Sequence, residues 1–350
     1  MPAFDIVVVG SGGGLDETNL SGYLVKPCNT SWNDGIVALE AGSGHGALRH
    51  IMKRDPSIFN EDRANEDSTE VTPFSVYSNV KCFLITHAHL DHINSLVISA
   101  GTMGGGRKRI YGSPQTLRDL ETVFSNRVWP RLATYDETDL SFRLVYRALH
   151  VDGKYQTIFP DISVRSMTVS HGKNSSGLYE SSCFFIKHIP TKHEFIFFGD
   201  VEPDSIAVKP KTISVWKAAA PKIPHDLSAI FIECSYPSGR PNELLWGHLS
   251  PKHLVQEMVA LATEVVLARK SSKAGARQHP RKKQKMDPTT SEALHGALTG
   301  LKVYVMHCKE HVSMERPMTE IIGDQCRELL EPHDLGLELL TADQGMKIVI

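Results

Sequence analysis

The chain has 350 residues, which is enough for one large domain or two and for a large buried core. Its formal net charge is −2, so no global basic field suggests a nucleic-acid partner. No apolar stretch approaches the ~18 residues that span a bilayer, and we therefore expect no transmembrane helix and no membrane partner.

The first ten residues and the cysteines predict a cytoplasmic protein. The segment MPAFDIVVVG lacks a basic region and carries Asp5 within a short apolar run, unlike a secretory signal peptide. The six cysteines are scattered without C-x-x-C pairing. Most of them lie in or beside apolar runs, where a free cysteine behaves as a small hydrophobic residue. This usage favours a reduced, intracellular protein.

Short apolar runs, which are typical of buried strands, recur along the chain. We predict strands at Ile6–Val9, Gly22–Val25, Ile36–Leu39, Cys82–Ile85, Ile162–Val169, Ser182–Ile186, Glu194–Phe198, Ala229–Ile232, Leu301–Met306 and Lys347–Ile350. Helical spacing of apolar residues predicts helices at Ser113–Asn126, Ser250–Arg269 and Met314–Glu331. Many strands with helices between them predict an α/β or α+β protein.

A glycine-rich segment, Gly10-Ser11-Gly12-Gly13-Gly14, follows the first predicted strand and invites comparison with dinucleotide-binding loops. That fingerprint needs G-x-G-x-x-G at the start of a helix, but the sixth position here is Leu15. The residues that follow are poor helix formers and lead into another strand. A β-hairpin with a glycine-rich connection therefore fits better than a nucleotide-binding fold.

The most informative segment is Thr86-His87-Ala88-His89-Leu90-Asp91-His92, directly after the strand predicted at Cys82–Ile85. Loops at strand ends commonly carry polar groups for chemistry. Imidazole nitrogens and carboxylate oxygens suit zinc and similar divalent ions. Four ligand-type side chains are too many for one tetrahedral site that must also accept ligands from elsewhere. The segment therefore suggests two metal ions that share the cluster.

Further ligand-type residues lie at or just beyond the carboxyl ends of other predicted strands. His171 follows the strand at Ile162–Val169, Asp200 follows Glu194–Phe198, and His307 follows Leu301–Met306. Each residue alone has an ordinary structural explanation. Their recurrence at one kind of position predicts that they converge on one edge of the fold and complete the metal site.

The composition changes between Arg269 and Lys285, where eight basic residues occur without an acidic one. We interpret 269–290 as a flexible, solvated insertion in a single domain of residues 1–350. The alternative is a nuclear-import or nucleic-acid-binding patch at Arg281–Lys285, which leaves nuclear entry open. Residues 60–68 form a second polar loop.

The ordered set of ligand-type residues resembles the metallo-β-lactamase superfamily. It consists of H-x-H-x-D-H at 87–92, then His171, Phe198-Gly199-Asp200 and the late His307. The longer string HAHLDHINSLVISA at 87–100 resembles the signature of the class II cyclic-nucleotide phosphodiesterases. Further matches are GDVEPD at 199–204, ECSY at 233–236 and GHLSP at 247–251. The resemblance covers roughly residues 5–260 and 300–350.

The resemblance implies a four-layer αβ/βα sandwich, in which two sheets face each other with helices outside. It also implies two divalent ions, for which the histidine-rich ligand set favours Zn²⁺. One ion would be held by His87, His89 and His171, and the second by Asp91, His92 and His307, with Asp200 bridging them. No ligand position is missing, which argues against a non-catalytic relative.

The activity that the resemblance implies is hydrolysis of 3′,5′-cyclic AMP to the 5′-nucleotide by a hydroxide that bridges the two metals, with cyclic GMP left open as a second substrate. We expect His248 to donate a proton to the departing sugar oxygen and Glu233 to orient it. Asp91 is expected to be catalytic as well as a ligand. Candidates for stacking on the purine are Tyr179, Phe74, Trp129 and Tyr236, although each also reads as ordinary packing.

Alternative functions of the same fold stay open. A tRNA 3′-processing nuclease shares the H-x-H-x-D-H motif and would need a basic arm, for which Arg269–Lys285 is a weak candidate. Deleting that stretch would distinguish the two enzymes. A non-catalytic nucleic-acid-processing scaffold would have lost ligands, and the extended signature disfavours a β-lactamase or thioester hydrolase. The sequence leaves the formation of a homo-oligomer undecided.

Overall fold

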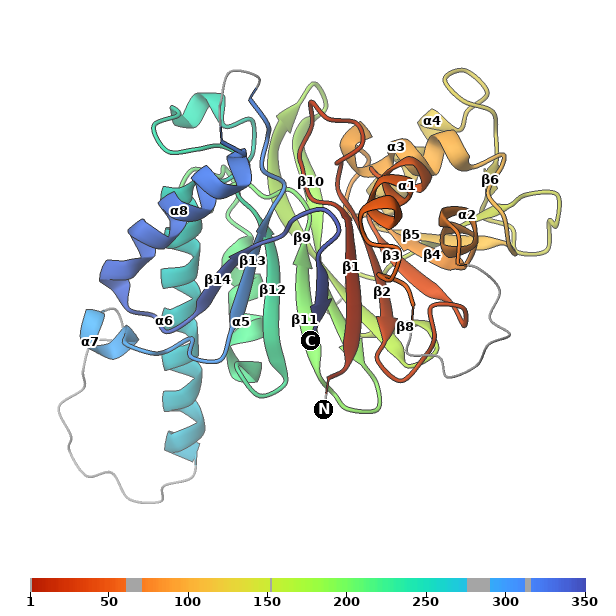
Figure 1. The fold of residues 1–350 in the computed structure, drawn as a ribbon. Coiled ribbons are helices and arrows are strands. Elements are labelled where there is room, and N and C mark those ends of the chain that lie inside the picture. Colours follow the sequence, from red (N-terminus) through yellow and green to blue (C-terminus); the bar gives the residue numbers. More distant parts are fainter. Residues whose placement is uncertain (1, 61–70, 152, 276–289, 312–315) are drawn as a thin grey trace.

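The computed structural model describes residues 2–60, 71–151, 153–275, 290–311 and 316–350, and its strands form two sheets (Figure 1). The first sheet contains β1 Phe4–Gly10, β2 Gly22–Pro27, β3 Ile36–Leu39, β4 Val80–Leu84, β5 Lys108–Gly112, β6 Ala133–Thr134, β7 Leu144–Ala148 and β15 Lys347–Val349. The second contains β8 Gln156–Phe159, β9 Ile162–Asn174, β10 Gly177–His188, β11 Glu194–Phe198, β12 Leu227–Glu233, β13 Lys302–Met306 and β14 Glu338–Thr341.

The strand order is β15-β1-β2-β3-β4-β5-β7-β6 in the first sheet and β14-β13-β12-β11-β10-β9-β8 in the second. The helices are α1 His45–Arg54, α2 Pro73–Ser78, α3 Leu90–Ser99, α4 Pro114–Val123, α5 Thr212–Ala219, α6 Pro251–Gly275, α7 Ser291–Leu294 and α8 Met318–Leu330. Helices α1 to α4 lie outside the first sheet, and α5, α6 and α8 lie outside the second (Figure 1). The predicted four-layer arrangement is confirmed.

Alternation along the strands explains the layers, because successive side chains of a strand point to opposite faces. In β11, Phe195 and Phe197 belong to the core between the two sheets, whereas Ile196 and Phe198 belong to the core beneath α5 and α6. The same separation occurs in β1, where Ile6 and Val8 lie in the central core and Val7 and Val9 belong to the core on the side of α1. Both faces of each sheet are therefore buried, and polar side chains collect at the strand ends.

The glycine-rich segment connects β1 to β2, which pair antiparallel, so the predicted hairpin is confirmed. The connection lies against the end of β13. The backbone N–H of His307 donates to the carbonyl of Ser11 at 2.6 Å, and a Cβ added to Gly13 would lie 2.7 Å from the His307 ring. Glycine is needed at 13 because the hairpin loop packs directly on that imidazole.

Some strand and helix ends in the structure differ from the predicted ends. Strand β9 continues to Asn174, so His171 lies within the strand instead of beyond its end. Helix α6 extends to Gly275, six residues past the predicted end at Arg269. Residues Arg269–Ser272 form an exposed part of this extension. The remainder of the basic stretch, at 276–289, and most of the polar loop at 60–68 lie outside the described residues. Within the described ranges, no helix combines the length and the apolar character that crossing a bilayer requires.

Asp204 stabilises the start of helix α5. Its carboxylate accepts hydrogen bonds from the backbone N–H groups of Lys211 and Thr212 at 2.9 Å and of Ile213 at 2.7 Å. These are N–H groups that a helix cannot satisfy internally. We expect Asp204→Ala to lower the free energy of unfolding by about 1–2 kcal/mol, as measured by urea denaturation. Asp204→Asn keeps one acceptor oxygen and should lose less; equal stability of Asp204→Ala and the wild type would contradict this capping role.

Candidate metal centre

The H-x-H-x-D-H segment connects β4 to α3. His87 and His89 lie in the loop after the strand, and Asp91 and His92 lie in the first turn of the helix. The loop is held from behind by Glu40, whose buried carboxylate accepts from the backbone N–H of Thr86 at 3.3 Å. The apolar strand therefore ends abruptly in a turn that directs four polar side chains to one side.

The other three predicted ligands come from the second sheet. His171 is in β9, Asp200 follows β11 after Gly199, and His307 follows β13. Strands β11, β12 and β13 are parallel, so their carboxyl ends meet at one edge of the sheet. The structure thus brings all seven predicted side chains to one place, where the edges of the two sheets face each other.

Four of these side chains form a first group. His87 Nε2 lies 3.1 Å from His89 Nδ1, and His171 Nε2 lies 3.3 Å from the same nitrogen. Asp200 Oδ2 lies 3.5 Å from His87 Nε2 and 3.6 Å from His171 Nε2. The four ligand atoms lie within 4.8 Å of one another, close enough to surround a single ion.

A second group is formed by Asp91, His92, His307 and again Asp200. His92 Nε2 lies 3.1 Å from His307 Nε2, which is 3.2 Å from Asp91 Oδ2. Asp200 Oδ1 lies 3.3 Å from His92 Nε2 and 3.4 Å from His307 Nε2. The two carboxylate oxygens of Asp200 therefore face different groups, which is the arrangement that a bridging ligand requires.

The surroundings favour the metal-binding protonation states of His87 and Asp200, whereas burial lowers the pKa of His92 but the carboxylates of Asp200, Asp91 and Glu40 outweigh it and raise that pKa overall. Burial lowers the pKa of His87 to about 3, so its imidazole is neutral at neutral pH. Burial alone would raise the pKa of Asp200, but His307 and His92 hold it well below its ordinary value. A neutral imidazole and an ionised carboxylate are the forms that bind cations. The donor set thus fits divalent metal ions.

Surrounding groups orient most of the imidazoles through the ring nitrogen that faces away from the cluster. His87 Nδ1 contacts Thr86 Oγ1 at 3.0 Å, and His307 Nδ1 contacts Ser235 Oγ at 3.0 Å. His171 Nδ1 donates to the carbonyl of Gly247 at 2.9 Å. Partners of this kind fix the tautomer and ring direction of a metal-binding histidine.

His248 and Glu233 lie beside the second group. His248 Nδ1 is 2.9 Å from Glu233 Oε1 and 3.8 Å from Asp200 Oδ2. Burial lowers the pKa of His248, but the carboxylates of Glu233 and Asp200 outweigh it and raise the pKa overall. These contacts all use Nδ1, which leaves Nε2 on the side of the ring away from the carboxylates. The imidazole is placed to carry a proton on Nε2 while Nδ1 donates to Glu233.

Glu233 also holds the backbone around the site. Its Oε1 accepts from the N–H of Val201, the residue after Asp200, at 2.9 Å. Its Oε2 accepts from the hydroxyl of Ser235 at 2.6 Å. The Ser235 Oγ in turn contacts both His248 and His307. One buried carboxylate therefore ties the expected proton donor to two of the expected ligands.

Several participating residues were not predicted from the sequence. Ser235 and Thr86 were not expected to contact histidines, and nothing in a lone hydroxyl residue signals such contacts. Lys309 Nζ lies 3.8 Å from Asp91 Oδ2, and its position two residues after His307 was a signal that could have been used. Glu40 Oε1 lies 3.6 Å from His92 Nδ1. Tyr179, a stacking candidate, lies against the His89 ring, with centroids 4.9 Å apart and planes at 12°.

Comparison with known proteins agrees with the family resemblance of the sequence. The family described as cAMP phosphodiesterases class-II matches residues 52–345. A 3′,5′-cyclic-nucleotide phosphodiesterase of Schizosaccharomyces pombe is 32% identical over 281 residues, covering 75% of this chain and 76% of the relative.

Solved structures share the fold. Unliganded yeast PDE1 superposes with a TM-score of 0.81 at 23% identity, over 100% of both chains. The metallo-beta-lactamase fold protein YhfI from Bacillus subtilis has a TM-score of 0.55 at 14% identity, over 99% of both chains. The predicted metallo-β-lactamase sandwich is thereby confirmed.

Proposed function

This chain belongs to the class-II cAMP phosphodiesterases, and we propose that the cluster of seven ligand-type side chains is where it hydrolyses 3′,5′-cyclic nucleotides. The family match covers most of the chain, and related proteins carry the name of this activity. The observation that carries the proposal is the presence of both ligand groups in one site, with Glu233 and His248 beside them.

We assign two divalent ions to this centre. His87, His89 and His171 would hold one ion, and Asp91, His92 and His307 the other, with Asp200 shared between them. The support is the orientation of Asp200, whose Oδ2 faces the first group and whose Oδ1 faces the second. Five imidazoles with two carboxylates favour Zn²⁺ over Mg²⁺, which prefers oxygen ligands.

When bound, such ions lower the pKa of a water molecule to about 7 and offset the charge of a phosphodiester. Hydrolysis adds the OH of water to phosphorus, breaks the bond to the 3′ oxygen and leaves a 5′-monophosphate. The 3′ oxygen must gain a proton as it departs, and the proposed donor is His248 through Nε2. Glu233 keeps the proton on that ring by accepting from Nδ1 and raising its pKa. Cyclic GMP contains the same phosphodiester ring and is a second substrate by the same chemistry.

The test is a product assay with purified, metal-replete protein and cyclic AMP. We expect 5′-AMP to accumulate, turnover to stop after a chelator removes the ions, and Zn²⁺ to restore it. Cyclic AMP left intact by the metal-replete protein would refute the activity. Full turnover after chelation would refute the metal centre, and formation of 3′-AMP would refute the direction of bond cleavage.

A further inference from the structure

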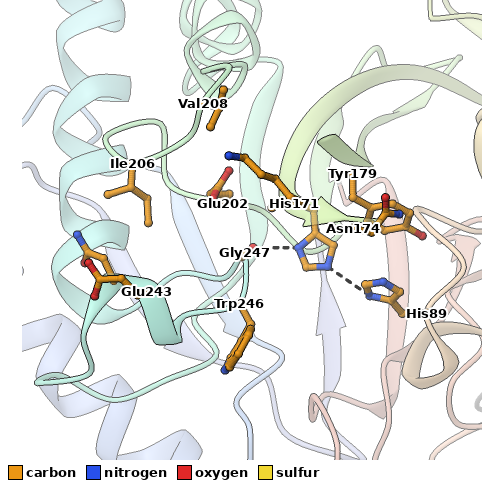
Figure 2. Close-up of a pocket in the computed structure, with 13 residues that line it drawn as sticks. His89, His171, Asn174, Tyr179, Glu202, Ile206, Val208, Glu243, Trp246 and Gly247 are labelled. Carbon is orange, nitrogen blue, oxygen red and sulfur yellow. Dashed lines mark hydrogen bonds between the residues drawn. The ribbon is translucent and has the colours of Figure 1, made fainter. Parts of the chain in front are cut away.

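A cavity of about 740 Å³ adjoins the proposed metal centre (Figure 2). His89 and His171 form part of its wall, so anything that fills it lies against the first ligand group. Its volume is within the ~300–1,000 Å³ range of sites for small organic ligands. If the phosphate of a cyclic nucleotide lies at the metal centre, its nucleoside must occupy space beside that centre. This cavity provides such space.

Trp246 is an unusual residue of that cavity wall. Its side chain is 65% exposed, although tryptophan is normally highly buried. Its backbone has a φ of 54°, in the left-handed region that a bulky residue rarely adopts. A strained backbone that holds a large aromatic ring in solvent is common at binding sites, where the ligand completes the packing of the ring.

The backbone fixes Trp246 relative to the centre. The next residue is Gly247, whose carbonyl accepts from His171 Nδ1 at 2.9 Å (Figure 2). After it comes His248, which is held by Glu233. Three consecutive residues therefore supply an exposed ring, a contact that orients an expected metal ligand, and the expected proton donor. Trp246 is therefore one residue from the contact that orients His171 and two residues from the expected proton donor.

The rest of the wall suits a heterocyclic base. Ile206 and Val208 provide apolar surface, and Val208 is exposed like Trp246. Glu202 and Asn174 provide a carboxylate and an amide (Figure 2). An aromatic ring with some apolar surface and a few polar groups is how proteins bind bases, because every base has a face that stacks and an edge that forms hydrogen bonds.

We infer that this cavity is the nucleoside subsite and that Trp246 is the ring on which the purine stacks. The inference rests on the proposed function, since it assigns the base of that substrate. Trp246 was not among the stacking candidates that the sequence suggested, and it replaces them.

The structure places those candidates less favourably for stacking on a base in this cavity. Tyr179 lines the cavity, but its ring stacks on His89. Tyr236 lines a separate cavity of about 300 Å³, and the Arg240 guanidinium lies 3.9 Å over its ring. Trp129 packs against the core beneath the first sheet, and Phe74 is an exposed residue of α2.

The experiment compares two substrates on Trp246→Ala. Stacking on an aromatic side chain is worth ~1–3 kcal/mol per base, which corresponds to about a 5- to 150-fold change. We expect the KM for cyclic AMP to rise by that factor with kcat within about twofold, because stacking is lost equally from the ground state and the transition state. With ribose 3′,5′-cyclic phosphate, which has no base, the variant should match the wild type.

Trp246→Phe keeps an aromatic face, and its KM for cyclic AMP should lie between those of the wild type and Trp246→Ala. Phe74→Ala removes an exposed aromatic residue from α2 and should leave both substrates unaffected. An unchanged KM for cyclic AMP in Trp246→Ala would overturn the stacking role. Equal losses on both substrates would also overturn it, because they indicate a structural role. If Trp246→Ala misfolds, a Trp246→Phe variant that is equally impaired would overturn it too. If the wild type leaves cyclic AMP intact, the proposed function itself fails, which is a separate outcome.

Discussion

Asp200→Ala is expected to lose both metal ions and essentially all turnover of cyclic AMP. Its two oxygens face different ligand groups at 3.3–3.6 Å, so the substitution removes one ligand from each. It also removes the carboxylate that, in our assignment, would offset the charge of two buried ions. The loss of activity should exceed the ~10²–10⁴-fold that a general acid supplies. Metal analysis of the purified variant, together with its kcat, measures both effects.

Asp204→Ala is the matched control, because it removes a carboxylate four residues further along that caps α5 and does not face the cluster. That variant should keep its metal content even though it is less stable. A fully metallated Asp200→Ala protein would contradict the bridging assignment. Loss of one ion alone would show that Asp200 serves a single group.

His248→Ala is expected to keep both metal ions and lose ~10²–10⁴-fold in kcat. The imidazole is bound through Nδ1 to Glu233, and in our assignment the ligand groups are complete without it. Its contribution should depend on the leaving group. A p-nitrophenyl phosphodiester releases a weakly basic oxygen that needs no proton, so its turnover should fall much less than that of cyclic AMP.

The control for that experiment is His253→Ala, which removes another buried histidine, five residues away at the start of α6. It should retain turnover of both substrates. Normal hydrolysis of cyclic AMP by a metal-replete His248→Ala protein would reject the proton-donor role. Equal losses on both substrates would also reject it, since they would indicate damage to the metal centre.

The sequence predicted much of the sheet framework because buried strands are nearly continuous apolar runs. The predicted bounds of Ile36–Leu39 and Glu194–Phe198 coincide with β3 and β11. Strands β5 and β7 were missed because Lys108, Arg109 and Arg147 interrupt short apolar segments. Lys108 is nevertheless buried, since its ammonium donates to the carbonyls of Ser78 and Val80. Tertiary hydrogen bonds of this kind override the pattern of a single segment.

Several helices were missed for a related reason. Helix α3 begins inside the ligand segment, so its first turn carries Asp91 and His92 in place of an apolar stripe. Helix α1 follows a glycine-rich turn, and its N-cap Gly44 provides no side-chain oxygen that would mark the start of a helix. In α3 the ligand-type residues stand where a start signal would be expected, and in α1 that signal is absent.

The positions of the candidate ligands could be predicted because residue type and placement at strand ends are both visible in a sequence. Side-chain direction is not visible there. The two directions of the Asp200 carboxylate, the contacts of Ser235 and the exposure of Trp246 depend on how distant segments pack. The metal assignments and the single domain with its insertion at 269–290 stay predictions.

The proposed ligand set is divided between the two halves of the chain. His87, His89, Asp91 and His92 come from the first sheet, and His171, Asp200 and His307 come from the second. Neither half alone offers a full set for even one ion. In our assignment, metal affinity would therefore be coupled to the docking of one half on the other, and metal-loaded protein should resist their separation. A chain split between β7 and β8 would be inert as separate fragments and would recover its ions only on complementation.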